Sequence, residues 1–273
     1  MSRLVRVAVL TVAVALLAGC GDAGHNSASR RRSSTGSSPM MTPSTQPSPQ
    51  LTQASSPLAG VTVVVDAGHN RGNFGHTKEI ARQVPDGKGG SKPCNTTGTQ
   101  TDDGYREAEY TWDVSQRLVA LLRQAGANVV TTVRADTPWG PCVDQRAKIG
   151  NDAHAAAVVS IHADGGPAGK RGFHVMEPGL SGPNKEPSHR LAAAVRDAYR
   201  SGSPMPVSNY IGVDGLNPRT DMAGLNLSQV PAVMLESGNM RNATDAALMG
   251  DASFRQTLAA ALVTALRNFV SSR

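Results

Sequence analysis

The hydrophobic positions of the chain form two kinds of segment that alternate along it. Short continuous apolar runs, typical of buried parallel strands, occur at 61–65, 128–133, 155–162, 173–176 and 230–236. Segments with apolar residues at helical spacing begin at Glu107, Val143 and His189, and another covers residues 251–270. Strands that alternate with helices predict an α/β domain with a largely parallel sheet covered on both faces.

The first 57 residues lack this pattern. Residues 1–20 carry Arg3 and Arg6, then a short apolar run, and end in LAGC, which resembles a bacterial lipobox with Cys20 as the lipidated residue. We therefore predict a lipoprotein signal peptide, with an ordinary cleaved signal as the alternative. Residues 21–57 are rich in Ser, Thr and Pro and have few large apolar side chains, which predicts a disordered tether. Residues 58–273 remain as a single domain, anchored to the outer face of the cytoplasmic membrane.

The positive charge of the chain gives no reason to expect a nucleic-acid partner. The formal net charge is +6, but residues 1–57 hold 5 basic and 1 acidic residues, so the domain itself keeps only +2. Aromatic residues make up only 4% of the chain, which is unfavourable for a surface that stacks on bases. We expect a monomer that binds no nucleic acid.

Two cysteines remain after Cys20 is assigned to the lipobox. Cys94 and Cys142 both lie in segments that contain Pro or Gly, and an exported protein meets oxidising surroundings. We predict a disulfide between them. It would close a loop of about 48 residues and stabilise the fold by roughly 3–4 kcal/mol on the chain-entropy model.

Three of the predicted strands end on ionisable residues. VVVDAGH ends at His69, VVSIH at His162 and AVMLE at Glu236. In open α/β sheets, sites lie in the crevice outside the carboxyl ends of the strands. If the three strands are parallel, these side chains converge on one edge of the sheet.

Two imidazoles suggest a metal site that needs a third ligand, and Glu107 and Glu109 are the candidates. Glu107 precedes Val114 by seven residues and Leu118 by eleven, so it lies on the apolar face of the predicted helix, whereas Glu109 is about 200° round and faces solvent. A buried carboxylate needs a partner. That partner is a metal ion, an arginine or the start of the helix itself.

Two histidines and one carboxylate with an open position can hold catalytic Zn²⁺, or Fe(II) that reacts with O₂. Glu236 favours zinc-dependent hydrolysis, because a carboxylate beside the metal can take a proton from water and pass it to a leaving amine. Nothing in the chain indicates a cosubstrate site or the strand pattern of an Fe(II) oxygenase.

Four ordered segments resemble a known family. VVVDAGHN, the glutamate of GYREAEYTWDVSQRL, VVSIHAD and PAVMLESGNMRN are similar to zinc-dependent N-acetylmuramoyl-L-alanine amidases of bacterial cell walls, above all to mycobacterial members with a bare catalytic domain. The resemblance covers nearly all of residues 60–270. It implies a twisted sheet of about six strands between helices.

The resemblance also implies roles for particular residues. His69, Glu107 and His162 would hold one Zn²⁺, and Glu236 would be the catalytic glutamate. The bond broken would join the lactyl group of N-acetylmuramic acid to L-Ala in peptidoglycan or muropeptides. Asp66 is a candidate for orienting a ligand, and Asp164 for contacting substrate.

Some positions depart from the family pattern, and two other functions stay open. Thr111 replaces a common Asn, and residues 224–226 replace a Val-Leu-Arg run, so an arginine contact to substrate would be missing. The alternatives are another zinc peptidase of wall peptides, such as a carboxypeptidase, and a non-catalytic peptidoglycan-binding lipoprotein.

Overall fold

The computed structural model describes residues 57–272. The predicted lipobox at Cys20 and almost all of the predicted tether therefore lie outside the described residues. Within residues 57–272, none of the helices has the length and apolar character needed to cross a membrane.

The main sheet has six strands in the order β4-β1-β5-β8-β6-β7. The strands are β1 (Thr62–Ala67), β4 (Asn128–Thr131), β5 (Ala157–Asp164), β6 (His174–Pro178), β7 (Leu216–Arg219) and β8 (Ala232–Asn239). β4, β1, β5 and β8 run parallel to one another, whereas β6 is antiparallel to β8 and parallel to β7. The prediction of a mostly parallel sheet of about six strands is confirmed.

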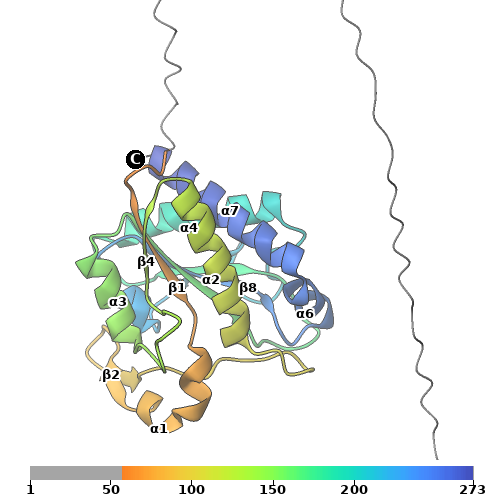
Figure 1. Ribbon diagram of the computed structural model, residues 1–273. Coiled ribbons are helices and arrows are strands. Elements are labelled where there is room, and N and C mark those ends of the chain that lie inside the picture. The colour runs from red at the N-terminus through yellow and green to blue at the C-terminus, as the bar shows by residue number, and fades with distance from the viewer. Residues whose placement is uncertain (1–56, 273) are drawn as a thin grey trace, which may run out of the picture. The chain divides into compact units, whose positions relative to one another are not determined.

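Helices cover both faces of this sheet (Figure 1). α2 (Glu107–Gln124), α4 (Lys185–Gly202) and α7 (Ala252–Ser271) pack together on one face, and α3 (Val143–Asp152) and α5 (Ala223–Asn226) lie on the other. α6 (Ala243–Gly250) precedes α7. The apolar residues predicted to form one stripe of the last helix are all buried: Phe254, Leu258, Leu262, Leu266 and Phe269.

Side chains alternate between the two faces along each strand. On β8, Val233 and Leu235 join the main core beneath α2, α4 and α7, while Met234 points to the other face. On β5, Val159 and Ile161 also belong to the main core. Because the period of a strand is two residues, the even-numbered side chains of β5, β6 and β8 share the face opposite the main core. These are the strands that carry the candidate functional residues.

The segment between β1 and α2 contains four short elements within residues 68–104. They are the 3₁₀ helix η1 (Arg71–Gly75), α1 (Thr77–Ile80) and the antiparallel pair β2 (Gln83–Pro85) and β3 (Ser91–Pro93). Each is too short to show a periodic pattern in the sequence. The same holds for β7 and α5, which the sequence pattern did not predict.

The helix predicted from His189 begins earlier, at Lys185. Pro187 lies in its first turn, where proline is tolerated because the backbone N–H has no partner within the helix.

Candidate metal centre

Three polar side chains meet at the carboxyl edge of the sheet. His69 follows β1 by two residues, His162 lies near the end of β5, and Glu107 is the first residue of α2. One ligand atom from each lies within 4.8 Å of the others. Glu109 instead lies on the outer side of the helix, where it pairs with Arg106. The helical phase argument therefore selected the glutamate that the structure places beside the two histidines.

The carboxylate of Glu107 lies between the two imidazoles. Its Oε2 is 3.1 Å from Nε2 of His69, and its Oε1 is 2.9 Å from Nδ1 of His162. Burial alone would raise the pKa of Glu107, but the two imidazoles outweigh it and hold the pKa far below its usual range. Burial alone would lower the pKa of His69, and the Glu107 carboxylate outweighs that effect and raises it. The Glu107 carboxylate is thus an anion enclosed by two imidazoles.

This donor set fits a divalent metal ion. Two imidazole nitrogens and one carboxylate make up a common protein ligand set of catalytic zinc sites. The surroundings leave room around the ligand atoms: a Cβ on Gly98 would lie 2.8 Å from Oε2 of Glu107 and 2.8 Å from Cδ2 of His69. Gly98 has φ +82°, a conformation that other residues rarely adopt. A side chain at this position would fill the space that borders both ligands.

The backbone of His69 is held in an unusual conformation by neighbouring side chains. Its φ is +61°, in the left-handed region that non-glycine residues rarely occupy. Arg146 donates to the carbonyl oxygen of His69, and to that of Ala67 at 2.6 Å. Thr111 Oγ1 donates to the carbonyl oxygen of Gly68 at 2.7 Å. These contacts fix the direction in which the imidazole leaves the chain.

Asp66 binds Arg146, the residue that holds the backbone of His69. Its Oδ1 accepts from Arg146 Nη1 at 2.6 Å, and its Oδ2 accepts from Ser160 Oγ at 2.5 Å. Burial would raise the pKa of Asp66, but the Arg146 guanidinium and the hydroxyls of Ser160 and Thr132 outweigh it and hold the pKa below its usual value. Asp66 is therefore a charged, buried group that is linked to His69 through Arg146.

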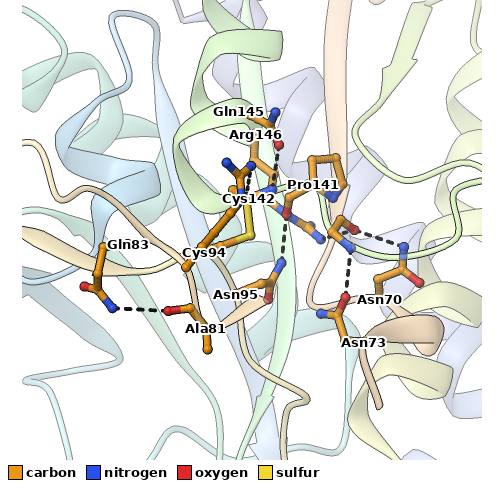
Figure 2. The surroundings of a disulfide bond; sticks show 12 residues. Asn70, Asn73, Ala81, Gln83, Cys94, Asn95, Pro141, Cys142, Gln145 and Arg146 are labelled. Atoms are coloured by element: carbon orange, nitrogen blue, oxygen red, sulfur yellow. Dashed lines mark hydrogen bonds between the residues drawn. A yellow bond between two sulfur atoms is a disulfide. The ribbon is translucent and has the colours of Figure 1, made fainter. Parts of the chain in front are cut away.

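The predicted disulfide is confirmed, and it anchors a loop beside the candidate ligands. Cys94 and Cys142 are bonded, with their Cα atoms 4.4 Å apart. Next to the bridge, Asn95 Nδ2 donates to the carbonyl oxygen of Pro141 at 2.8 Å, as Figure 2 shows. The bridge and this hydrogen bond join the start of the 94–99 loop to the two residues that immediately precede α3.

The 94–99 loop contacts two of the candidate ligands directly. The carbonyl oxygen and Oγ1 of Thr96 each lie 3.1 Å from Nδ1 of His69. The backbone N–H of Thr99 donates to Oε2 of Glu107 at 2.9 Å. Because a carbonyl oxygen only accepts, its bond to Nδ1 places the proton of a neutral His69 on Nδ1 and leaves the lone pair on Nε2.

Glu236 lies on β8, directly beside His162 of β5 in the sheet register. Its Oε2 is enclosed and has no hydrogen-bond partner among residues 57–272. Burial raises the pKa of Glu236 well above its usual value, and the negative charges of Glu107 and Asp164 raise it further. An enclosed carboxyl oxygen without a hydrogen-bond partner is costly, so Oε2 of Glu236 points to a catalytic role for this residue.

A cavity of about 390 Å³ opens beside these groups. Three methionines from separate segments form part of its wall: Met176, Met222 and Met234. The β2–β3 hairpin contributes Lys92, whose Nζ donates to the carbonyl oxygen of Asp221 at 2.9 Å. The cavity thus combines apolar surface with the candidate ligands and Glu236, and has the dimensions of a small-molecule or peptide site.

Asp164 also lines the cavity. Its Oδ2 accepts from the hydroxyl of Tyr210 at 2.8 Å and lies 3.6 Å from Nε2 of His174. Burial would raise the pKa of Asp164, and the contacts with His174 and Tyr210 outweigh it and lower the pKa. The sequence analysis named Asp164 as a candidate, but it did not name its contacts Tyr210 and His174, and it did not name Arg146. Arg146 lies in an amphipathic helix, where an arginine is expected to face solvent.

The domain matches a known protein family over most of its length. The profile of the family described as N-acetylmuramoyl-L-alanine amidase matches residues 63–268. The chain belongs to this family. All of the candidate ligands and Glu236 lie within the matched range.

Individual relatives support the assignment. The chain is 44% identical over 218 residues to the N-acetylmuramoyl-L-alanine amidase Rv3717 of Mycobacterium tuberculosis. This match covers 79% of this chain and 89% of that protein. Two solved structures of N-acetylmuramyl-L-alanine amidases, both called Ami1, are also 44% identical. The match to the Mycobacterium smegmatis structure has a TM-score of 0.75 and covers 79% of this chain and 99% of that chain. The match to the apo structure from Mycobacterium abscessus has a TM-score of 0.73 and covers 77% of this chain and 99% of that chain.

Proposed function

We propose that this protein is a Zn²⁺-dependent N-acetylmuramoyl-L-alanine amidase. It hydrolyses the amide bond between the lactyl group of N-acetylmuramic acid and L-Ala in peptidoglycan or its muropeptides. The observation that carries the proposal is the cluster of His69, Glu107 and His162 in a domain of this family. These three residues would hold one Zn²⁺ ion.

A bound Zn²⁺ would supply Lewis-acid chemistry, polarising the scissile carbonyl and activating water. Glu236 takes the proton from the attacking water and returns it to the nitrogen of the leaving L-Ala. Its unpaired Oε2 suits this role, because none of residues 57–272 donates a hydrogen bond that would compete for the oxygen. The raised pKa of Glu236 lets one carboxyl group both accept and donate a proton during the reaction.

The supporting residues keep the ligands ready to bind metal. Thr96 holds the Nδ1 proton of His69, so Nε2 presents its lone pair. Thr99 fixes one oxygen of Glu107, and the backbone N–H of Ala163 donates to the other at 3.1 Å. A carboxylate held by two backbone donors needs little reorganisation when it coordinates a cation.

Analysis of reaction products tests this proposal. Purified peptidoglycan and muropeptides solubilised by a muramidase are incubated with the protein, and the products are weighed by mass spectrometry. An amidase releases intact stem peptides that begin with L-Ala and leaves sugars with a free lactyl carboxylate. Release of a single C-terminal amino acid would instead identify a carboxypeptidase. Retention on insoluble peptidoglycan without release of any peptide would identify a binding protein.

We further propose that the chain is exported and anchored by lipid at Cys20 to the outer face of the cytoplasmic membrane. The support is the lipobox-like LAGC and the preceding apolar run. The C20S variant should lose the lipid, detected by labelling with a radioactive fatty acid, and should leave the membrane fraction. Retention of the variant in the membrane fraction would contradict the anchor.

A further inference from the structure

Three side chains stand in a row on the cavity-facing side of the sheet. Glu236 of β8 is paired in register with His162 of β5 on one side and with His174 of β6 on the other. Neighbouring strands lie about 5 Å apart, so the candidate proton carrier has an imidazole on each side. His162 belongs to the metal cluster. His174 has no role in the mechanism described so far.

The protonation pattern of His174 follows from its neighbour Asn217. His174 is only 1% exposed, and Nδ2 of Asn217 lies 3.4 Å from its Nδ1. An amide NH₂ group can only donate, so Nδ1 must accept, and a neutral imidazole then carries its proton on Nε2. Nε2 has no hydrogen-bond partner among residues 57–272, and a carboxylate oxygen, Oδ2 of Asp164, lies 3.6 Å away. In this tautomer the buried N–H of His174 lies next to the Asp164 carboxylate, just beyond hydrogen-bonding distance.

Asp164 is held on its other side by Tyr210. The phenol donates to Oδ2 of Asp164 at 2.8 Å. The ring lies close to Gly166, where an added Cβ would come within 2.9 Å of Tyr210 Cε2. The Asp164 side chain is 30% exposed and lines the cavity beside Glu236. A single carboxylate oxygen is thus approached by two donors from separate elements while the carboxylate still faces the cavity.

We infer that His174 and Tyr210 are positioning residues that hold Asp164 as the acceptor for an amide N–H of the substrate. A peptide substrate brings such donors into the cavity, and a buried site that accepts from them must offer a fixed acceptor. His174 and Tyr210 act through Asp164 and do not touch the substrate. This inference rests on the proposed amidase function and adds a group that helps to align the peptide substrate in the cavity.

A double-mutant cycle tests the inference. His174→Leu, Tyr210→Phe and Asp164→Asn are compared singly and in pairs, with kcat and KM measured on solubilised muropeptides and zinc content and Tm measured on each variant. Each single change should lower kcat/KM by about 10- to 100-fold, the range found when a supporting side chain is removed. In the Asp164→Asn background, adding His174→Leu or Tyr210→Phe should lower kcat/KM by no more than about a further twofold. The effects of groups that act through one another do not add. His174→Gln, which keeps an N–H donor, should recover most of the loss.

The controls separate positioning from general destabilisation. Tyr105→Phe and His189→Leu make the same chemical changes away from the cavity and should leave kcat/KM unchanged. The inference would be overturned if the losses of kcat/KM were fully additive in the double variants. It would also be overturned if each loss of kcat/KM were matched by an equal loss of bound zinc. If His174→Leu fails to fold, Tyr210→Phe removes one oxygen atom from a half-buried side chain and carries the same cycle.

A spectroscopic measurement tests the same geometry without turnover. Long-range ¹H–¹⁵N spectra of protein labelled at histidine should show a proton on Nε2 of His174 and none on Nδ1, with a shifted Nε2 signal in Asp164→Asn. Protonation at Nδ1 would contradict the arrangement. Failure of the wild type to release any peptide would overturn the proposed function together with this inference, whereas additive losses would overturn this inference alone.

Discussion

Thr99 and Glu107 hold each other by two hydrogen bonds. The backbone N–H of Thr99 donates to Oε2 of Glu107 at 2.9 Å, and the backbone N–H of Glu107 donates to the carbonyl oxygen of Thr99 at 2.9 Å. The carboxylate proposed to bind zinc is therefore oriented by a loop rather than by its own helix. That loop begins at Cys94, so the metal centre depends on the segment that the disulfide anchors.

Removing the disulfide should weaken both the fold and the metal site. The C94S/C142S variant opens a loop of 48 residues and should lower the free energy of unfolding by about 3–4 kcal/mol. Because the loop that positions Glu107 and His69 loses its anchor, zinc affinity should fall about tenfold or more. Denaturant unfolding and competition with a zinc-binding dye measure the two effects. Unchanged zinc affinity would show that the loop is positioned without the bridge.

Gly98→Ala should weaken metal binding far more than it weakens the fold. The added methyl group would meet Oε2 of Glu107 and Cδ2 of His69, each at 2.8 Å. Gly104→Ala is a matched control, since Gly104 also has a positive φ, +92°, but nothing lies within 4 Å of its added Cβ. Both variants should lose about 1–2 kcal/mol of stability, because alanine is strained at a positive φ. Only Gly98→Ala should lose zinc affinity; equal affinities in the two would contradict this account of the site.

Asp66→Asn should destabilise the domain at neutral pH and change its response to acid. Loss of one partner of a buried ion pair costs about 3–5 kcal/mol. The pKa of Asp66 is lower in the folded state than in the unfolded chain. Its contribution is therefore present above the unfolded pKa of about 3.9 and is lost as pH falls through the folded pKa.

The difference in unfolding free energy between wild type and Asp66→Asn should accordingly shrink as the pH falls below about 5. Asp136→Asn is the control, because Asp136 pairs with Arg134 on the surface and both side chains are 74% exposed. That change should have almost no effect at any pH. A constant difference across the acid range would mean that Asp66 is not charged in the fold.

Glu236→Gln should stabilise the metal-free protein at high pH. The pKa of Glu236 is raised in the folded state, so its favourable contribution is full below the unfolded pKa of about 4.3 and is lost as pH rises through the folded pKa. Metal-free Glu236→Gln should therefore melt at nearly the wild-type temperature at pH 4 and above it at pH 8. In a domain of this size each kcal/mol corresponds to about 2–4 °C. Equal melting temperatures at both pH values would contradict the enclosed, unpaired carboxyl.

The sequence predicted the parts of the site that follow from local periodicity. The apolar runs that end on His162 and Glu236 predict that both side chains lie at one edge of the sheet, and helical phase separates the buried Glu107 from Glu109. Both patterns are read over a few residues and survive folding, because burial of the apolar face dictates them.

The remaining parts depend on long-range geometry that no local pattern encodes. His174 meets Glu236 only because β6 pairs antiparallel with β8 in one register. Arg146 reaches Asp66 across 80 positions of the chain. The Thr99 contact depends on the path of an irregular loop. The α/β class, the candidate ligands and Asp66 were therefore predictable, whereas the other groups that orient the candidate ligands were not.

The central claim is that a zinc ion held by His69, Glu107 and His162 works with Glu236 to cleave the amide. Its most direct test measures bound zinc and peptide release in the same preparations of wild type and Glu236→Ala, with muramoyl dipeptide and solubilised muropeptides as substrates. We predict one zinc per chain in both proteins, with release of the L-Ala peptide by the wild type only and loss of that release after chelation. Full release by Glu236→Ala, or by wild type that contains no metal, would contradict the account.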